Sequence, residues 1–486
     1  MNIAKIFKFT GRIMLVMAVL ALLPTAVAVW RGEEHLIPCF LITAGVFLAL
    51  WALSLLIKTK TEGYGARDGF AITALSWIFI TLIGALPFWI SREIPSYIDA
   101  FFETVSGFTT TGSSILSNVE AMSDSMLFWR SFSHWVGGMG VLAFGIALFP
   151  VAKGQSRESG TEAHILKAES PGPTYGKFVS KLRFNTRILY LIYLVMTVVE
   201  IVLLVMGGMP FFDSLLNSLG TAGTGGFAIK NAGIAAYNEY CRMVIAVFMV
   251  LFGVNFNFYY FMLIGKVKSA FKMEEVRWYI GIVLLSTAAI TANLLSYYDD
   301  LGESFRYAFF QVSSVITTTG YATANFDLWP EFSKVIIVLL MFIGACAGST
   351  AGGLKVSRLI ILVKSTTKEL WYSVNPRAVR VVKCDGEPLD RSVVINVSSY
   401  FAIYMLITAA STLLVSLDGY DTTTTFTSVV SCFNNIGPAL GLAGPYGNFG
   451  MFSVFSKIIL SLDMLLGRLE IFPLIVLFSP KLWKNG

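Results

Sequence analysis

Four related stretches decide the fold of this 486-residue chain: DAFFETVSGFTTTG (Asp99–Gly112), DSLLNSLGTAGTGG (Asp213–Gly226), YAFFQVSSVITTTG (Tyr307–Gly320) and TTFTSVVSCFNNIG (Thr424–Gly437). They align without gaps on their final glycine. A small residue stands six positions before that glycine in each stretch: Ser106, Gly220, Ser314 and Ser431. Each stretch lies between two long apolar runs, so the sequence predicts a fourfold internal repeat.

The composition is that of a polytopic membrane protein. Hydrophobic residues make up 55% of the chain and charged residues 14%, and the mean hydropathy is +0.70. Soluble proteins carry about 25% charged residues, which excludes a soluble enzyme, a nucleic-acid-binding protein or a disordered tail as the bulk of the chain. The five cysteines contain no CxxC pair and predict neither a disulfide framework nor a zinc site. Ionisable residues inside the apolar runs are too few and too isolated for a membrane enzyme, so we expect no enzymatic activity.

Ten apolar runs are long enough to cross a bilayer, which takes about 20 helical residues. They are Ile13–Trp30, Leu36–Ile57, Phe70–Ile90, Met126–Val151, Ile188–Met206, Met243–Ile264, Trp278–Tyr297, Val335–Ala347 with an unusual continuation, Val393–Leu417 and Phe452–Phe478. We therefore predict an all-α polytopic membrane protein with ten transmembrane helices, in which two N-terminal helices precede four repeats. The two leading helices occupy residues 1–69, and the repeats occupy 70–152, 185–268, 276–366 and 392–482. Each repeat consists of a spanning helix, a short re-entrant helix, a glycine loop and a second spanning helix; the loops lie at 109–113, 223–227, 317–321 and 434–438.

The basic residues are sorted by side. Of the Lys and Arg residues, 27 lie in the segments 1–12, 58–69, 152–187, 265–277, 355–392 and 479–486, and seven lie in the alternate loops and their margins. Short cytoplasmic loops carry the excess of Lys and Arg, so we expect both termini in the cytoplasm. The long basic segments 152–187 and 355–392 are expected to contact anionic membrane lipids.

The repeated unit suits a monovalent cation. Non-helical backbone survives within a bilayer only where it lines a wet cavity or is buried in protein, and glycine lets successive carbonyls point the same way. Four such loops around one axis would form a ring of oxygens that replaces the hydration shell of an ion. The loops themselves carry no carboxylate, which favours K⁺ or Na⁺ over Ca²⁺ or Mg²⁺.

Three further stretches carry a resemblance to a known family: Phe128–Gly140 (FWRSFSHWVGGMG), Ile343–Lys355 (IGACAGSTAGGLK) and Gly467–Pro473 (GRLEIFP). With them the chain resembles, over essentially its whole length, the Trk/Ktr/HKT superfamily of cation-conducting proteins, and within it the bacterial Trk branch. The resemblance implies four M1-P-M2 units arranged with pseudo-fourfold symmetry about a K⁺ pore, two such chains in a homodimer, and a place in the bacterial inner membrane.

The resemblance also assigns a selectivity filter by position, in which backbone carbonyls bind K⁺ as the transported ion. Its residues are Thr110, Thr111, Gly112, Thr224, Gly225, Gly226, Thr318, Thr319, Gly320, Asn435, Ile436 and Gly437. In this superfamily a serine in place of the first filter glycine accompanies Na⁺ transport, so the glycine at Gly112 favours K⁺, with Rb⁺ also passing. In the second loop the fourteen-residue alignment selects Gly226 as the counterpart of Gly112, whereas a Thr-Gly pair selects Gly225, and both remain open.

A glycine-rich stretch interrupts the second span of the third repeat. It comprises Gly344, Ala345, Cys346, Ala347, Gly348, Ser349, Thr350, Ala351, Gly352 and Gly353. Small residues at this density fit either close helix packing or a broken, pore-facing segment, and the resemblance implies an intramembrane loop that obstructs conduction until it moves. Arg468 is the second gate candidate, because a charge within a span is costly and marks function by default. It either pairs with Asp463 or Glu470, or faces the pore as an electrostatic barrier.

Three other residues lead to hypotheses. We expect Arg130 to neutralise a carboxylate near the filter, such as Glu103. His134 is expected to be a packed, hydrogen-bonded residue rather than a metal ligand. Glu200, in the middle of a span, is expected to be paired or to lie near a dimer surface.

The resemblance implies a cytosolic partner, a TrkA-type ring that binds ATP, ADP or NAD(H) and controls the gate. This chain has no Walker A or dinucleotide-binding fingerprint in a strand-turn-helix context, so we expect no cofactor in the chain itself. An alternating-access transporter often has inverted repeats, whereas these four share one orientation. A proton- or sodium-coupled K⁺ symporter on the same scaffold remains an alternative.

Overall fold

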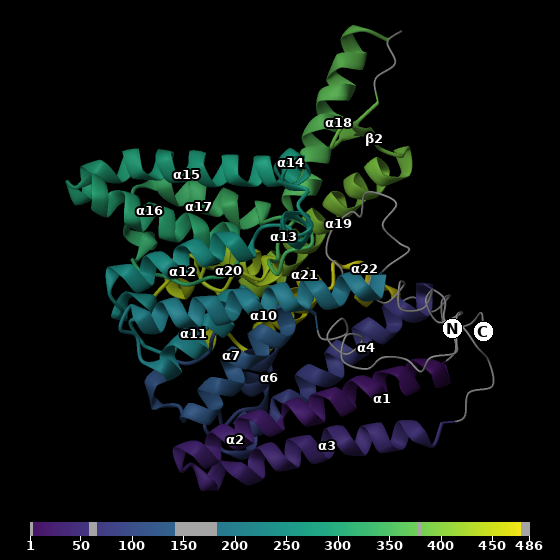
Figure 1. The fold of residues 1–486 in the computed structure, drawn as a ribbon, viewed down its shortest axis with the longest axis vertical. Coiled ribbons are helices and arrows are strands. Elements are labelled where there is room, and N and C mark those ends of the chain that lie inside the picture. The colour runs from purple at the N-terminus through teal and green to yellow at the C-terminus, as the bar shows by residue number, and fades with distance from the viewer. Residues whose placement is uncertain (1–2, 58–65, 141–181, 377–380, 478–486) are drawn as a thin grey trace.

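The computed structural model describes residues 3–57, 66–140, 182–376 and 381–477, and almost all of their regular structure is helical. In Figure 1, α1 (Ile3–Leu20) and α3 (Ile37–Leu55) lie along the lower edge of the view, α15 (Glu274–Tyr298) along the upper edge, and α18 (Val356–Val374) projects beyond the rest. The predicted all-α class is confirmed.

The N-terminal part is an antiparallel pair of long helices. The first is α1, continued by α2 (Leu22–Arg31), and it packs against α3. Gly11 of α1 meets Ser54 of α3 so closely that a Cβ on the glycine would lie 2.3 Å from the Ser54 Cβ. Glycine therefore sets the approach of these two helices.

The remainder repeats one pattern of three helices four times. The long first helices are α4 (Ala66–Gly84, continued by α5, Leu86–Ile90), α10 (Leu182–Met206), α15 and α19 (Arg391–Val415). The short helices that follow are α6 (Tyr97–Phe108), α11 (Phe211–Gly223), α16 (Leu301–Ile316) and α20 (Thr422–Asn434). The second helices are α7 (Asp124–Gly138), α12 (Glu239–Phe252), α17 (Glu331–Ile343) and α21 (Val454–Arg468). The short helices have 12 to 16 residues, or roughly 18–24 Å at the usual rise, less than the ~30 Å hydrocarbon core.

The units are linked in a closed order. Each second helix packs against the short helix of the next unit: α7 on α11, α12 on α16, α17 on α20, and α21 back on α6. The fourth unit thus contacts the first, as in a ring. The predicted repeat boundaries stay predictions, and those at 152 and 482 lie outside the described residues.

The second helices are interrupted more often than we expected. The sequence drew attention to one interruption, after α17, but α12 also ends at Phe252 and meets α13 (Phe256–Leu263) at 88°. Likewise α21 ends at Arg468, and three residues separate it from α22 (Phe472–Leu477). The runs predicted to span at Met243–Ile264 and Phe452–Phe478 therefore each contain a break in the helix that the sequence did not indicate. The run predicted at Met126–Val151 can be followed only as far as Gly140.

The number of spans stays a prediction for the same reason. Among the described residues, six helices are long and apolar enough to cross a membrane, or seven if α12 and α13 count as one bent span. The second helices of the four repeats account for four of the ten expected spans. As described, they have only 13 to 15 residues each, too few for one helix to cross a bilayer.

Short elements complete the described chain. A two-stranded antiparallel hairpin, β1 (Lys383–Cys384) and β2 (Glu387–Pro388), follows α18, and α14 (Val267–Lys272) precedes α15. The 3₁₀ turns are Glu34–Leu36, Val119–Ala121, Gly233–Ala236, Phe326–Leu328, Ser416–Asp418, Gly441–Ala443 and Phe449–Met451.

The contact between α1 and α3 can be tested with Gly11→Val. We expect this substitution to lower the melting temperature in detergent, because overpacking costs about 1–3 kcal/mol, and the double variant Gly11→Val/Ser54→Gly to recover part of the loss. Gly45→Val in α3 is the matched control, since a Cβ there meets no atom within 4 Å. Equal melting temperatures for Gly11→Val and Gly45→Val would contradict the close approach.

Candidate functional site

The four glycine loops meet around one axis. A Cβ built on the last glycine of each loop would collide with the backbone carbonyl of the middle residue in the next loop. The pairs are Gly112 with the Gly225 oxygen (2.1 Å), Gly226 with Thr319 (1.8 Å), Gly320 with Ile436 (1.9 Å) and Gly437 with Thr111 (2.9 Å). The series runs from the first loop to the fourth and returns to the first, so the loops form a closed ring.

The loops share one backbone conformation. The residue two places before each final glycine is left-handed although it is not glycine: Thr110, Thr224, Thr318 and Asn435 have φ between 52° and 57°. The final glycines Gly112, Gly226, Gly320 and Gly437 also have positive φ, from 71° to 107°. Gly226 thus occupies the position of Gly112 in the ring, and Gly225 that of Thr111.

The small residues noted in the sequence anchor these loops. The N–H of each middle loop residue donates to the carbonyl of the small residue five places earlier, at 2.9–3.0 Å. The pairs are Thr111 with Ser106, Gly225 with Gly220, Thr319 with Ser314 and Ile436 with Ser431. Each loop is therefore tied back onto the last turn of its short helix.

Two carbonyl oxygens in each loop, those of the two residues before the final glycine, are buried and accept no hydrogen bond from the described residues. Thr110, Thr111, Thr318 and Thr319 are fully buried, and their counterparts in the other two loops are buried as well. Among the described residues, no hydrogen bond ends on the backbone oxygens of these eight positions. Buried carbonyls in folded proteins almost always have a partner, and a cation is one such partner. The short helices end here, where the helix dipole favours positive charge.

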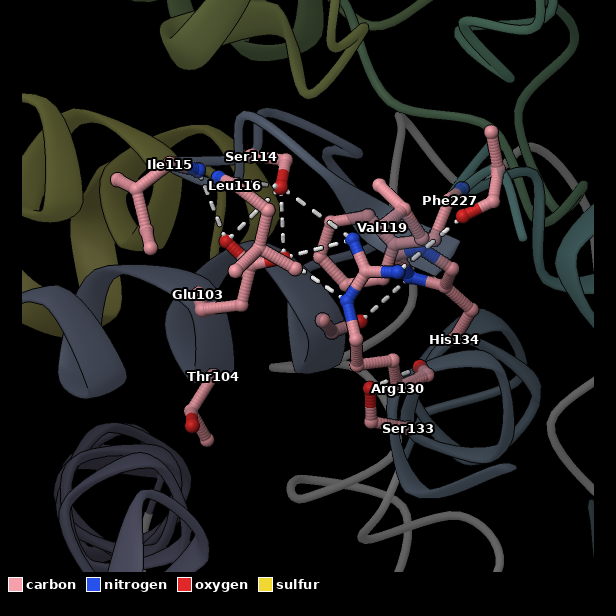
Figure 2. Close-up of polar contacts among 12 residues, drawn as sticks. Glu103, Thr104, Ser114, Ile115, Leu116, Val119, Arg130, Ser133, His134 and Phe227 are labelled. Carbon is pink, nitrogen blue, oxygen red and sulfur yellow. Dashed lines mark hydrogen bonds and ion pairs between the residues drawn. The ribbon is translucent and has the colours of Figure 1, made fainter. Parts of the chain in front are cut away.

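A buried ion pair lies next to the first loop and binds the residues that follow it, as Figure 2 shows. Arg130 of α7 donates from Nε (2.9 Å) and Nη2 (2.7 Å) to Oε1 of Glu103 of α6. The carboxylate also accepts the N–H of Ile115 and the hydroxyl of Ser114, which follow the loop. The predicted contact between Arg130 and Glu103 is confirmed.

His134 joins the first two units. Its Nδ1 lies 2.7 Å from the Gly107 carbonyl, and its Nε2 accepts the Phe227 N–H at 3.2 Å. These partners assign the proton to Nδ1, and Figure 2 shows the ring beside Phe227. The expectation of a packed, hydrogen-bonded histidine is confirmed.

The glycine-rich stretch 344–353 forms a loop instead of a helix and lies against the ring. The Gly352 N–H donates to Thr318 Oγ1 at 2.6 Å, and a Cβ on Gly352 would lie 2.4 Å from the Asn434 carbonyl. On its other side the loop fills the bend between α12 and α13. There the Cys346 N–H donates to the Gly253 carbonyl (3.1 Å), and the Gly348 carbonyl accepts from Phe256 (3.0 Å).

Arg468 connects three units beside this loop. Its guanidinium donates to the Thr350 carbonyl at 2.8 Å, to Thr110 Oγ1 at 3.3 Å, and to the carbonyls of Gly137 and Gly138 at the end of α7. Of the two carboxylates considered as its partners, Glu470 pairs with Arg358 (2.5 Å) and Asp463 accepts from Ser411 (2.7 Å).

Glu200 differs from our expectation. It is fully buried, and neither carboxyl oxygen has a hydrogen-bond partner among the described residues. Its side chain faces Thr221 in the last turn of α11. Among the described residues it therefore has no charged partner, and it does not lie at the surface of this chain.

The chain was compared with known proteins. The family model for TrkH, described as a cation transport protein, matches residues 37–485. The Trk system potassium uptake protein TrkH of Salmonella typhimurium is 35% identical over 427 residues, 86% of each chain, and the Trk system potassium uptake protein TrkG of Escherichia coli is 33% identical over 475 residues, 96% of each. This chain belongs to the TrkH family. A crystal structure of the potassium transporter TrkH from Vibrio parahaemolyticus matches all of both chains, with a TM-score of 0.88 at 30% identity.

Membership in the TrkH family, together with the long apolar helices, makes the chain a multi-pass membrane protein. Sequence reasoning did not single out the side-chain hydroxyls of Thr110 and Thr318 as contacts for Arg468 and the loop. It also missed Asn255 and Glu275, which contact the loop from the side away from the ring. An ordinary glutamate in the first turn of a helix offers no sequence signal for such a role.

The ion pair behind the first loop leads to a stability prediction. We expect Arg130→Met to lower the free energy of unfolding by about 3–5 kcal/mol, because it leaves the buried Glu103 carboxylate without its charge partner. Thermal unfolding in detergent measures the loss. The control is Lys334→Met, which removes an ion pair with Glu331, a residue whose side chain is 84% exposed; it should cost less than about 1 kcal/mol. Similar losses for both variants would contradict the assignment.

Proposed function

We propose that this protein takes up K⁺ across the bacterial inner membrane by channel-like conduction, with Rb⁺ as a second permeant ion. The ring of loops carries the proposal: eight buried backbone oxygens, which accept no hydrogen bond from the described part of the chain, surround one axis at the ends of four short helices. Such a site supplies uncharged oxygens in place of water, which suits a desolvated monovalent cation. Relatives that align with nearly the whole chain are named as potassium uptake proteins.

The filter in this proposal consists of the twelve loop residues assigned from the sequence. Conduction is gated by loop 344–353 together with Arg468, which lie beside the ring and contact the filter residues Thr318 and Thr110. A fixed positive charge next to the pathway raises the electrostatic energy of a passing cation. Moving the loop and the guanidinium together would remove both the obstruction and the barrier.

The proposal includes partners outside this chain. A second copy would form a homodimer, and a cytosolic TrkA-type ring that binds ATP, ADP or NAD(H) would control the gate, with both termini of this chain in the cytoplasm. The relatives' names, which refer to a Trk system, support a multi-component assembly.

Arg468→Ala tests the gate and the function together. We expect the variant to raise Rb⁺ flux into proteoliposomes about tenfold or more in the absence of any regulatory ring, because both the charge and the contact with Thr350 are lost. The flux is measured for Rb⁺ and Na⁺, with and without a TrkA-type ring and nucleotide. Arg31→Ala is the control, since Arg31 pairs with Asp124 at a partly exposed site outside the ring. Unchanged flux would contradict the gating role of Arg468, and no cation flux under any condition would contradict the function.

A proton-coupled K⁺ symporter is the second candidate. The buried Glu200 carboxyl, which has no charged partner among the described residues, favours it. For a channel, the K⁺ reversal potential in liposomes stays unchanged when a pH gradient is imposed, in wild type and in Glu200→Gln alike. We expect this result. A reversal potential that follows the pH gradient in wild type and loses this dependence in Glu200→Gln would establish the symporter instead.

A further inference from the structure

Glu275 is the second residue of α15. It lies where α15, α18 and the bend between α12 and α13 meet the intramembrane loop, residues 344–353. Its Oε1 accepts the Ala347 N–H of the loop at 2.6 Å and the Ser357 N–H of α18 at 3.2 Å. Its Oε2 accepts from Nδ2 of Asn255, in the bend between α12 and α13, at 3.3 Å. One carboxylate thus joins the loop, the helix that follows it and the bend in which the loop sits.

A carboxylate is a favourable acceptor for each of these three donors. The Ser357 N–H lies in the first turn of α18, where helix N–H groups have no partner within the helix and the dipole favours an anion. The Ala347 N–H belongs to a non-helical, buried segment that cannot satisfy its own backbone. Asn255 is itself oriented, because its Oδ1 accepts the Asn257 N–H at 3.0 Å. Hydrogen bonds to a charged acceptor are about twice as strong as neutral ones.

The neighbouring carboxylate has different partners. Glu274 pairs with Lys364 of α18 at 2.5 Å, and it exchanges hydrogen bonds with the backbone and carboxylate of Asp385 in the β1–β2 hairpin. None of these partners belongs to loop 344–353. Glu275 therefore binds the loop, whereas the adjacent Glu274 binds the projecting helix α18 and the hairpin.

We propose that Glu275 is the positioning residue that keeps the intramembrane loop in its closed place against the ring. This inference rests on the proposed function, in which that loop obstructs conduction. Without the Glu275 carboxylate the loop loses its charged anchor at Ala347. It keeps its contacts near the ring and its backbone hydrogen bonds to the bend between α12 and α13, but it leaves the closed position more often.

Cys346 provides a native reporter of loop position. It lies next to Ala347 and is fully buried. Cys432, which is also fully buried, lies in the short helix α20 and reports on unfolding of the ring. We would measure the rates at which a membrane-impermeant maleimide labels each cysteine in the full-length protein in detergent, resolved by peptide mass spectrometry, and Rb⁺ flux in proteoliposomes without a regulatory ring.

Glu275→Ala is expected to raise the labelling rate of Cys346 about tenfold or more, equivalent to about 1.4 kcal/mol, while the rate at Cys432 stays unchanged. Rb⁺ flux should rise with it. Glu274→Ala, the matched control, should leave the Cys346 rate at the wild-type value. Glu275→Gln keeps an acceptor for Ala347 and Ser357 without the charge, so its labelling and flux should fall between wild type and Glu275→Ala.

Unchanged Cys346 labelling in Glu275→Ala would overturn the inference. If both cysteines react faster, the alanine variant has unfolded and Glu275→Gln decides: a faster Cys346 rate with Cys432 protected supports the inference, and a wild-type rate overturns it. Faster Cys346 labelling without increased Rb⁺ flux supports the hold by Glu275 and counts against the gating role of the loop in the proposed function.

Discussion

The approach of each loop's last glycine to the carbonyl of the next loop is the contact on which the rest of the structure depends. A side chain at Gly226 or Gly320 would place its Cβ within 2 Å of the neighbouring carbonyl oxygen, so the ring closes only with glycine at these positions. Closure also requires four short helices to converge at one depth, and each second helix packs on the short helix of the next unit to hold them there. The fourfold repeat in the sequence reflects this requirement for a glycine next to a carbonyl in every loop.

The same ring explains why the proposed ion site consists of backbone oxygens. Left-handed φ at Thr110, Thr224, Thr318 and Asn435 costs energy for residues with a Cβ, and burying carbonyls without donors costs more. Both costs are tolerated where the surrounding structure over-determines the conformation, here through the hydrogen bond from each loop to the last turn of its helix. A cation at the axis would offset the desolvation of those oxygens.

Much of this arrangement could be predicted from the sequence, because each of the four stretches needs a final glycine and a small residue six positions before it. The repeat, the all-helical class and the Arg130–Glu103 pair follow from pattern and charge. The breaks after α12 and α21 do not, since apolarity is the same in a straight and a bent helix and one glycine costs only about 1 kcal/mol. Those breaks depend on contacts from distant segments: the loop fills the bend after Gly253, and a Cβ on Gly467 would lie 1.9 Å from the Phe433 carbonyl. Glu200 was misjudged because its charge suggested an ionic partner, which the described residues do not supply.

In the proposed mechanism the loop is held from two sides by different chemistry. Near the ring, Arg468 and Thr318 hold Thr350 and Gly352; on the opposite side, Glu275 holds Ala347. Hydrogen bonds to charged groups contribute about 1.5–3 kcal/mol each, so the two charged contacts together approach the ~5.5 kcal/mol that moves an equilibrium from 1:99 to 99:1. In this proposal a regulator that acts on α18 would reach the loop from the Glu275 side, through the Ser357 contact and the hydrogen bond from the Val356 N–H to the Ala345 carbonyl. A passing ion would instead meet Arg468. In the proposed mechanism, release from the side of α18 therefore need not break the contacts that Arg468 and Thr318 make at the ring in the same step.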